Sequence, residues 1–275
     1  MKTILVINDN SAGVVNAAKL AFFIAQETHA NIVLANTFKL CSSFAEKAIP
    51  GNTASGQDDL LMTNLGEYLD GLNDRPNDFE PAIDEMDTSV MDVHQLAQMI
   101  NQRDIWMIVK GAAEPLSTGD YGNINFNTLL TLVRCPLLLI PETWSLKNIE
   151  RLVYLADLPY CRLQIVRYLA GLAKLWHADL SIAHVSKEGP VGMDKDLGDE
   201  VPDDEVRNKV NYDQLFFNNI PEGDLNTAVD MLINGMHNDF LVMAQHHFRC
   251  MGLVGPYVAG GLPPHITVPL LIFPS

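Results

Sequence analysis

The sequence contains one series of segments twice, and this repeat constrains the fold more than any other feature. Four blocks return in the same order: Thr3–Asp9 as Arg151–Asp157, His29–Ala35 as His177–Ala183, Asp104–Val109 as Asp239–Ala244 and Cys135–Pro141 as Val268–Pro274. The spacing falls from 148 positions for the first block (157 − 9) to 133 for the last (268 − 135), because the later segments of the second half are shorter. Four blocks in order indicate a duplicated domain, and the long period favours two globular units over a solenoid.

The length and the apolar content agree with two domains. A chain of 275 residues fits about two domains of roughly 100–200 residues each. It is 48% hydrophobic, which is enough for a core in each half. We predict one domain over residues 1–143 and a second over 148–275, with the boundary near Glu142–Asn148.

Within each half, predicted strands alternate with predicted helices. For the first half we expect strands at Thr3–Asn8, Asn31–Phe38, Pro81–Asp87 (a poor candidate), Ile105–Lys110 and Leu137–Ile140, and helices after a Ser11 cap and at Leu60–Leu72, Val90–Arg103 and Phe126–Val133. For the second half we expect strands at Arg151–Ala156, Leu180–Val185, Gln214–Asn218, Phe240–Met243 and Pro269–Phe273, helices at Arg162–Trp176 and Leu225–His237, and an acidic loop over Ser186–Asp204.

This alternation, with near-continuous apolar strands, predicts an α/β fold: two similar domains, each a five-stranded parallel sheet with helices on both faces. In such sheets ligands bind beyond the carboxyl ends of the strands, where the strand order reverses. The final strand of each half is apolar, and we expect the two domains to pair within the chain through these strands, since exposed apolar sheet edges are a liability.

Several classes of protein are disfavoured by composition. No apolar run approaches the ~20 residues of a membrane helix, and the N-terminus lacks the apolar region of a signal peptide. Four cysteines without paired spacing indicate reduced thiols, and hence a cytoplasmic location, with Cys135 packed in a core. The net charge of −16 argues against a nucleic-acid partner, since phosphate binding needs clustered Lys and Arg.

The order of elements carries a resemblance to a known family. The Asp directly after the first strand (Asp9, Asp157), the fourth strand preceded by Asp (Asp104, Asp239) and the Cys-Pro-apolar-Pro ending at Cys135–Pro141 resemble the universal stress proteins. Nearly the whole chain resembles a tandem member of this family. The resemblance implies a fold of the adenine nucleotide alpha hydrolase type and a role in stress tolerance.

The resemblance also implies a nucleotide site that this sequence matches only in part. ATP-binding members place the strand-end Asp near the adenine and a Gly-x2-Gly-x9-Gly-[Ser/Thr] loop after the fourth strand, where glycines let backbone N–H groups approach phosphate. In the first half Gly119 and Gly122 have the first spacing, but Leu132 stands where the final glycine belongs. In the second half Gly252 and Gly255 are followed by His265 at that place. Both loops are degenerate.

If either half holds a nucleotide, we expect the first. Six of its residues are the candidate lining of a crevice: Asp9, Asn10, Gly111, Gly119, Gly122 and Asn123. Glu114 and Asp120 would repel a triphosphate there. We therefore predict no cofactor, with ATP bound by the first domain as the alternative.

Other polar groups receive structural interpretations. His246, His247, Cys250 and His265 are soft metal ligands in type, but their spacing fits no known site, so we predict no metal. His29 and His177 stand at matching places, where we expect them to terminate helices. A strand-end Asp can act as a base or can bond nearby backbone N–H groups, and we favour structure or ligand orientation over catalysis.

Three function classes follow. The first is a non-catalytic stress-response protein that binds a protein partner or a small ligand. The second is a nucleotide-binding version, for which weak ATPase activity stays open. The third is a structural, dimerising protein with vestigial pockets. In each, we expect neither nucleic acid nor membrane as partner, and a homodimer is left open.

Overall fold

A computed structural model describes most of the chain as two compact units, Met1–Leu146 and Lys147–Ser275. The described residues are 1–9, 11, 13–37, 65–72, 79–112, 124–156, 162–186, 203–221, 225–244 and 266–274. The two-domain bounds proposed from the sequence stay a prediction, and each unit is described by itself.

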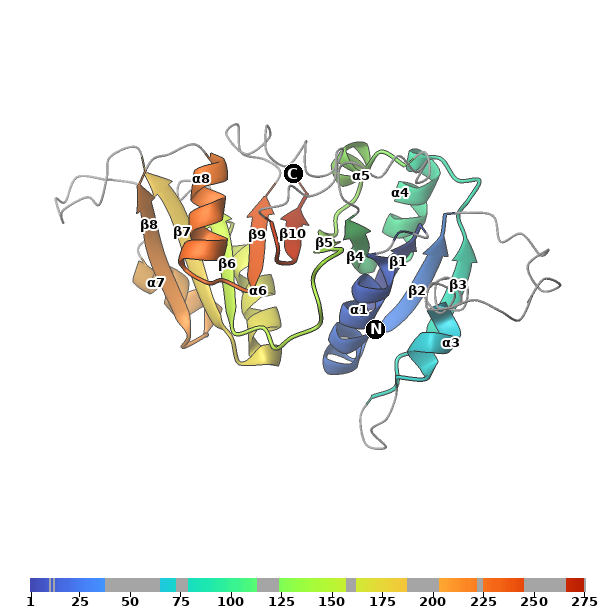
Figure 1. Cartoon of the computed structure of the whole chain (residues 1–275), viewed down its shortest axis with the longest axis horizontal. Helices are drawn as coiled ribbons and strands as arrows, with labels where there is room; N and C mark the ends of the chain where they lie inside the picture. Colours follow the sequence, from blue (N-terminus) through green and yellow to red (C-terminus); the bar gives the residue numbers. More distant parts are fainter. Residues whose placement is uncertain are drawn as a thin grey trace, which may run out of the picture. The chain divides into compact units, whose positions relative to one another are not determined.

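The two units repeat a similar order of strands and helices (Figure 1). The elements of the first unit are β1 (Thr3–Asn8), α1 (Val14–Thr28), β2 (Asn31–Asn36), α3 (Leu65–Asp70), β3 (Ile83–Asp87), α4 (Val93–Gln102), β4 (Ile105–Ala112), α5 (Phe126–Leu132) and β5 (Leu137–Pro141). Those of the second are β6 (Arg151–Ala156), α6 (Leu163–Trp176), β7 (Asp179–Ser186), α7 (Asp203–Val210), β8 (Leu215–Pro221), α8 (Leu225–Asp230), the π-helical turn η3 (Met231–Gly235), β9 (Phe240–Ala244) and β10 (Leu270–Phe273).

Strand pairing confirms the predicted fold class. Within the described part of the first unit the strand order is β3-β2-β1-β4-β5, and in the second it is β10-β9-β6-β7-β8. Every pairing within these two sets of five is parallel. Both sheets are therefore doubly wound. In each, the order in which strands are added reverses beside the first strand.

The central strands are buried because their side chains are apolar on both faces. The residues Ile4–Ile7 of β1 are at most 1% exposed, and β5 and β9 are buried throughout. Parallel strands joined by right-handed crossovers need helices on both faces. In the first unit α1 contacts α3 and α4 contacts α5, as expected for two separate helical layers.

The predicted bounds are closest for the buried strands and least accurate at polar segments. β1 and β6 match their predicted ranges. The cap assigned to Ser11 is wrong: Gly13 is the N-cap of α1 and provides no side-chain bond, while the backbone carbonyl of Ser11 accepts from Val14 N. The acidic loop predicted to run to Asp204 is also wrong at its end, because α7 already begins at Asp203.

The two histidines terminate their helices as predicted, but through the backbone. His29 and His177 are the C-caps of α1 and α6, with φ of 51° and 52° in the left-handed region. The N–H of each donates to helix carbonyls three and four residues earlier, which closes the last turn. The His29 ring packs against Phe79 at an interplanar angle of 41°, with the ring centroids 5.0 Å apart.

Cys135 is a buried thiol between α5 and β5, as predicted, and it should be chemically inert. Burial raises the pKa of Cys135 to about 12, and the nearby Asp104 carboxylate adds to this rise. Since the thiolate is the reactive form, only about one thiol in ten thousand is ionised at pH 8. We expect iodoacetamide at pH 8 to modify Cys135 in urea but not in the native protein, as read from the mass of its peptide. Native modification at the rate of a free cysteine would contradict the burial.

Among the residues placed in the structure, no helix is both long and apolar enough to cross a membrane.

Candidate functional site

The candidate site lies at the carboxyl edge of the first sheet, between β1 and β4. These strands are neighbours, and the chain turns one way from β1 through β2 to β3 before it crosses back to β4. The gap between their carboxyl ends is therefore the point at which strand order reverses, where doubly wound sheets bind ligands. Asp9 follows β1 at this point, and Lys110 lies in β4 beside Ile7.

An ion pair crosses this switch point. Lys110 Nζ lies 2.8 Å from Asp9 Oδ2, and the two side chains are 15% and 4% exposed. The other oxygen, Asp9 Oδ1, accepts the backbone N–H of Ser11 at 3.1 Å. Asp9 therefore accepts a hydrogen bond at Oδ1, while Oδ2 is paired with Lys110 by charge and accepts no hydrogen bond among the described residues. The negative charge of Asp9 is offset at short range.

The ammonium of Lys110 is held on three sides. Besides Asp9, it donates to the carbonyl oxygen of Gly111 at 2.8 Å, and it lies 5.4 Å from the ring centroid of Phe126 in α5. Carboxylate, carbonyl and aromatic face are each favourable partners for a cation, and a cation–π contact contributes from about 0.5 kcal/mol when exposed to about 2 kcal/mol when desolvated. The side chain is therefore fixed over the end of the sheet.

A second polar group continues from β1 across β2 to β3. Asn8 Nδ2 donates to Asn36 Oδ1 at 2.8 Å, and both residues are buried. Asn36 Nδ2 lies 3.5 Å from Glu85 Oε2, and Thr88 Oγ1 donates to the Asn36 carbonyl at 3.0 Å. These side chains bond one another, so they stabilise the strand ends as a connected network.

Gly111 lies in β4 directly after Lys110, and its close neighbour is the start of helix α1. A Cβ placed on Gly111 would come within 2.5 Å of the Gly13 carbonyl carbon and 2.8 Å of Val14 N. Glycine here lets the first turn of α1 approach the backbone of β4. Packing therefore accounts for this glycine, and a contact with phosphate stays a prediction.

The described residues test the predicted lining only in part. Asp9 and Gly111 both contact Lys110 at the switch point, and their role as the lining of a ligand site stays a prediction. Asn10, Gly119, Gly122 and Asn123 lie outside the described residues, as do Glu114 and Asp120 of the same loop. Ser11 Oγ lies beside Asp9 and is buried, without a hydrogen-bond partner among the described residues.

Lys110 was missed by the reasoning from the sequence. A signal was present, because Lys110 ends the apolar run of a predicted strand and Asp9 directly follows another. Once these strands are taken as neighbours in a parallel sheet, their end residues share one edge, and opposite charges there should pair. When each strand is considered alone, the pairing of Lys110 with Asp9 cannot be predicted.

The corresponding site of the second unit is largely outside the described residues. This holds for Asp157, Gly252, Gly255 and all four soft ligands considered for a metal. In the part that is described, no group of three or more His, Cys, Asp or Glu side chains could hold a metal ion. The repeat places Gln245 where the first half has Lys110, so this lysine is not repeated in the sequence.

Comparison with solved structures identifies the fold. A universal stress protein from Archaeoglobus fulgidus DSM 4304 aligns over 99% of this chain and 96% of its own, at 11% identity and a TM-score of 0.58. The chain has the universal stress fold. A candidate universal stress protein from Pseudomonas aeruginosa UCBPP-PA14 aligns over 99% and 93%, at 13% identity and a TM-score of 0.52.

The universal stress fold is shared here at very low identity. A protein of unknown function from Pseudomonas aeruginosa PAO1 also aligns over 99% of this chain and 92% of its own, at 13% identity and a TM-score of 0.55. No family model and no curated protein matches the sequence. The likeness therefore concerns the fold, and function has to be argued from the residues at the site.

Proposed function

We propose that this chain is a non-catalytic stress-response protein that binds a protein partner or a small ligand, and that it does not use ATP. The observation that supports this is the ion pair of Asp9 and Lys110 across the switch point. The strand-end Asp, which in ATP-binding universal stress proteins lies near the adenine, is here already in an ion pair with Lys110 and accepts a hydrogen bond from Ser11 N.

The charges of the first loop favour the same proposal. A triphosphate needs several backbone donors and cationic help or Mg²⁺. Neither degenerate loop has the final Gly-Ser pair, and the first contains Glu114 and Asp120. The nearest described cation, Lys110, is engaged by a carboxylate, so its charge is not free for a phosphate. The reduced, cytoplasmic setting inferred from the cysteines is part of this proposal.

One observation favours the alternative, in which the first unit binds a nucleotide. Lys110 is a cation at the sheet edge, and the buried Oγ of Ser11, whose backbone N–H bonds Asp9, has no hydrogen-bond partner among the described residues. A ligand that displaced Asp9 from Lys110 would find both groups. It would first have to break a short buried ion pair, which is why we rank this function second.

Thermal unfolding in the presence of Mg-ATP tests the proposal. A ligand that binds the folded state stabilises it by about 2.7 kcal/mol at a hundredfold excess over Kd, which raises Tm by several degrees. We expect millimolar Mg-ATP to leave Tm unchanged within about one degree. An upward shift that saturates at micromolar Mg-ATP would contradict the proposal and support the alternative, and Mg²⁺ with sulfate serves as the control for ionic strength.

A further inference from the structure

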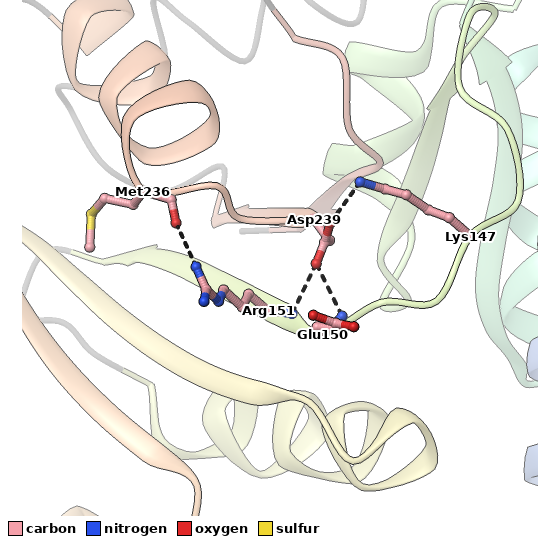
Figure 2. A network of polar contacts seen from close by, with 5 residues as sticks. All are labelled: Lys147, Glu150, Arg151, Met236 and Asp239. Carbon is pink, nitrogen blue, oxygen red and sulfur yellow. Dashed lines mark hydrogen bonds and ion pairs between the residues drawn. The ribbon is translucent and has the colours of Figure 1, made fainter.

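The segment that leads into the second unit is fastened by one carboxylate. Figure 2 shows Asp239, directly before β9, facing this segment. Its Oδ1 lies 2.7 Å from Lys147 Nζ, and its Oδ2 accepts the backbone N–H groups of Glu150 at 3.1 Å and Arg151 at 3.2 Å. One side chain thus holds three points within five consecutive residues.

The start of β6 is also tied to the end of the preceding helix. Arg151 Nη1 donates to the Met236 carbonyl at 3.3 Å, where η3 ends (Figure 2). A cation at a helix carboxyl end is favoured by the helix dipole. Between these bonds Ile149 is 1% exposed, so the segment has an apolar anchor as well.

The π-helical turn accounts for the position of Asp239. In the first unit the left-handed residue after α4 is Asp104 itself, directly before β4. In the second unit it is His237, and two more residues follow before β9. Asn238 is buried there, and the Leu232 carbonyl accepts its side-chain Nδ2 at 2.7 Å and its backbone N–H at 3.4 Å. Because of these two additional residues, Asp239 does not adopt the left-handed conformation that Asp104 adopts in the first unit.

The other end of the connecting segment is held by the first unit. Asn16 Nδ2 of α1 donates to the Glu142 carbonyl at 3.3 Å, and Trp144 is buried. Between this anchor and Lys147 stand Ser145 and Leu146, both exposed. Neither residue makes a hydrogen bond in the described part of the chain.

We propose that Asp239 is a latch that confines the joint between the two units to Ser145 and Leu146. The latch fixes the residues from Lys147 onward to the second unit, so the connection does not act as a longer flexible linker. This inference is independent of what the first unit binds, because its residues lie away from the switch point of Asp9 and Lys110 in the sequence and in the element order.

Hydrogen exchange of the full chain tests the latch, with Asp239→Asn compared with Asp104→Asn. Both changes remove one charge directly before a strand, but only Asp239 bonds the connecting segment. We expect Asp239→Asn to speed amide exchange in the peptide covering 147–152 roughly tenfold, since its charge-assisted bonds are lost. Exchange in α6 should stay as in the wild type, and Asp104→Asn should leave the 147–152 peptide unchanged.

Two results would overturn the inference: an unchanged 147–152 peptide in Asp239→Asn, or equal acceleration in both variants. If Asp239→Asn unfolds the second unit, as shown by faster exchange in α6, Lys147→Gln replaces it. This milder variant removes the ion pair and keeps both backbone bonds, and we expect roughly threefold faster exchange in the same peptide. Wild-type exchange in Lys147→Gln would then contradict the latch.

Discussion

The Gly111→Ala variant is expected to lose about 2–3 kcal/mol of stability, because overpacking against backbone atoms forces neighbouring elements apart. The added Cβ would meet the Gly13 carbonyl carbon at 2.5 Å and its oxygen at 2.9 Å, and neither can move without shifting α1. Urea unfolding followed by fluorescence measures the loss, with Trp106 and Trp144 in the first unit and Trp176 in the second.

Gly171→Ala is the matched control for this substitution. Gly171 is exposed in α6, and a Cβ placed there meets nothing within 4 Å. Alanine in a helix interior is favoured over glycine by about 0.5–1 kcal/mol, so this variant should be slightly more stable than the wild type. If Gly111→Ala were as stable as Gly171→Ala, the contact between α1 and β4 would be contradicted.

The second large effect is expected for the ion pair. Lys110→Met leaves the Asp9 carboxylate buried without its cation, and breaking a buried pair in this way costs about 3–5 kcal/mol. Asp9→Asn leaves the Lys110 ammonium, which is somewhat more exposed, and should cost less. The double variant Asp9→Asn/Lys110→Met removes both charges and should be more stable than Lys110→Met alone.

A double-mutant cycle of urea unfolding measures this coupling. We expect the losses of unfolding free energy in the two single variants, added together, to exceed the loss in the double variant by about 2 kcal/mol. This coupling lies within the usual range for residues in contact. Strict additivity would mean that the two groups do not interact, and it would remove the observation on which the proposed function depends. Lys147→Met is a suitable control, because Lys147 pairs with Asp239 but its side chain is 50% exposed.

The parts of the fold that sequence predicted well are those decided by apolar burial. β1 and β6 are continuous apolar runs next to an Asp, and any parallel arrangement buries them. β3 was a poor candidate because Ile83, Asp84, Glu85, Met86 and Asp87 are mostly polar. It forms nevertheless, and among the described strands it pairs with β2 alone, as an edge strand, where charged residues are well suited.

Helix ends were harder to predict from the sequence, since they depend on hydrogen bonds and charges of a few neighbouring polar residues. Asp203 and Asp204 were taken as the end of a loop, yet acidic residues are favoured in the first turn of a helix, and α7 begins at Asp203. The π turn at Met231–Gly235 has no sequence signal that distinguishes it from an ordinary helix end. The π turn depends on the distance that the chain must span between the helix and β9, and this distance is determined by the tertiary structure.

The edge of the sheet that holds the candidate site could be predicted, whereas the ligand lining at that edge stays a prediction. Asp9 and Gly111 could be placed at the switch point from the strand order alone. Their partners could not, because Lys110 and the first turn of α1 come from the register between strands and from helix packing. A residue beside a predicted site can therefore decide whether that site is open.

Native mass spectrometry of the freshly purified protein tests the central claim most directly, because it shows what occupies the chain without added ligand. The account predicts a single species at the mass of the chain, or one increased by a ligand other than a nucleotide, and no binding of ATP when Mg-ATP is added at micromolar concentration. A species whose mass is increased by one ATP or ADP would contradict the account if the amount of bound nucleotide changes in Lys110→Met but not in Lys147→Met.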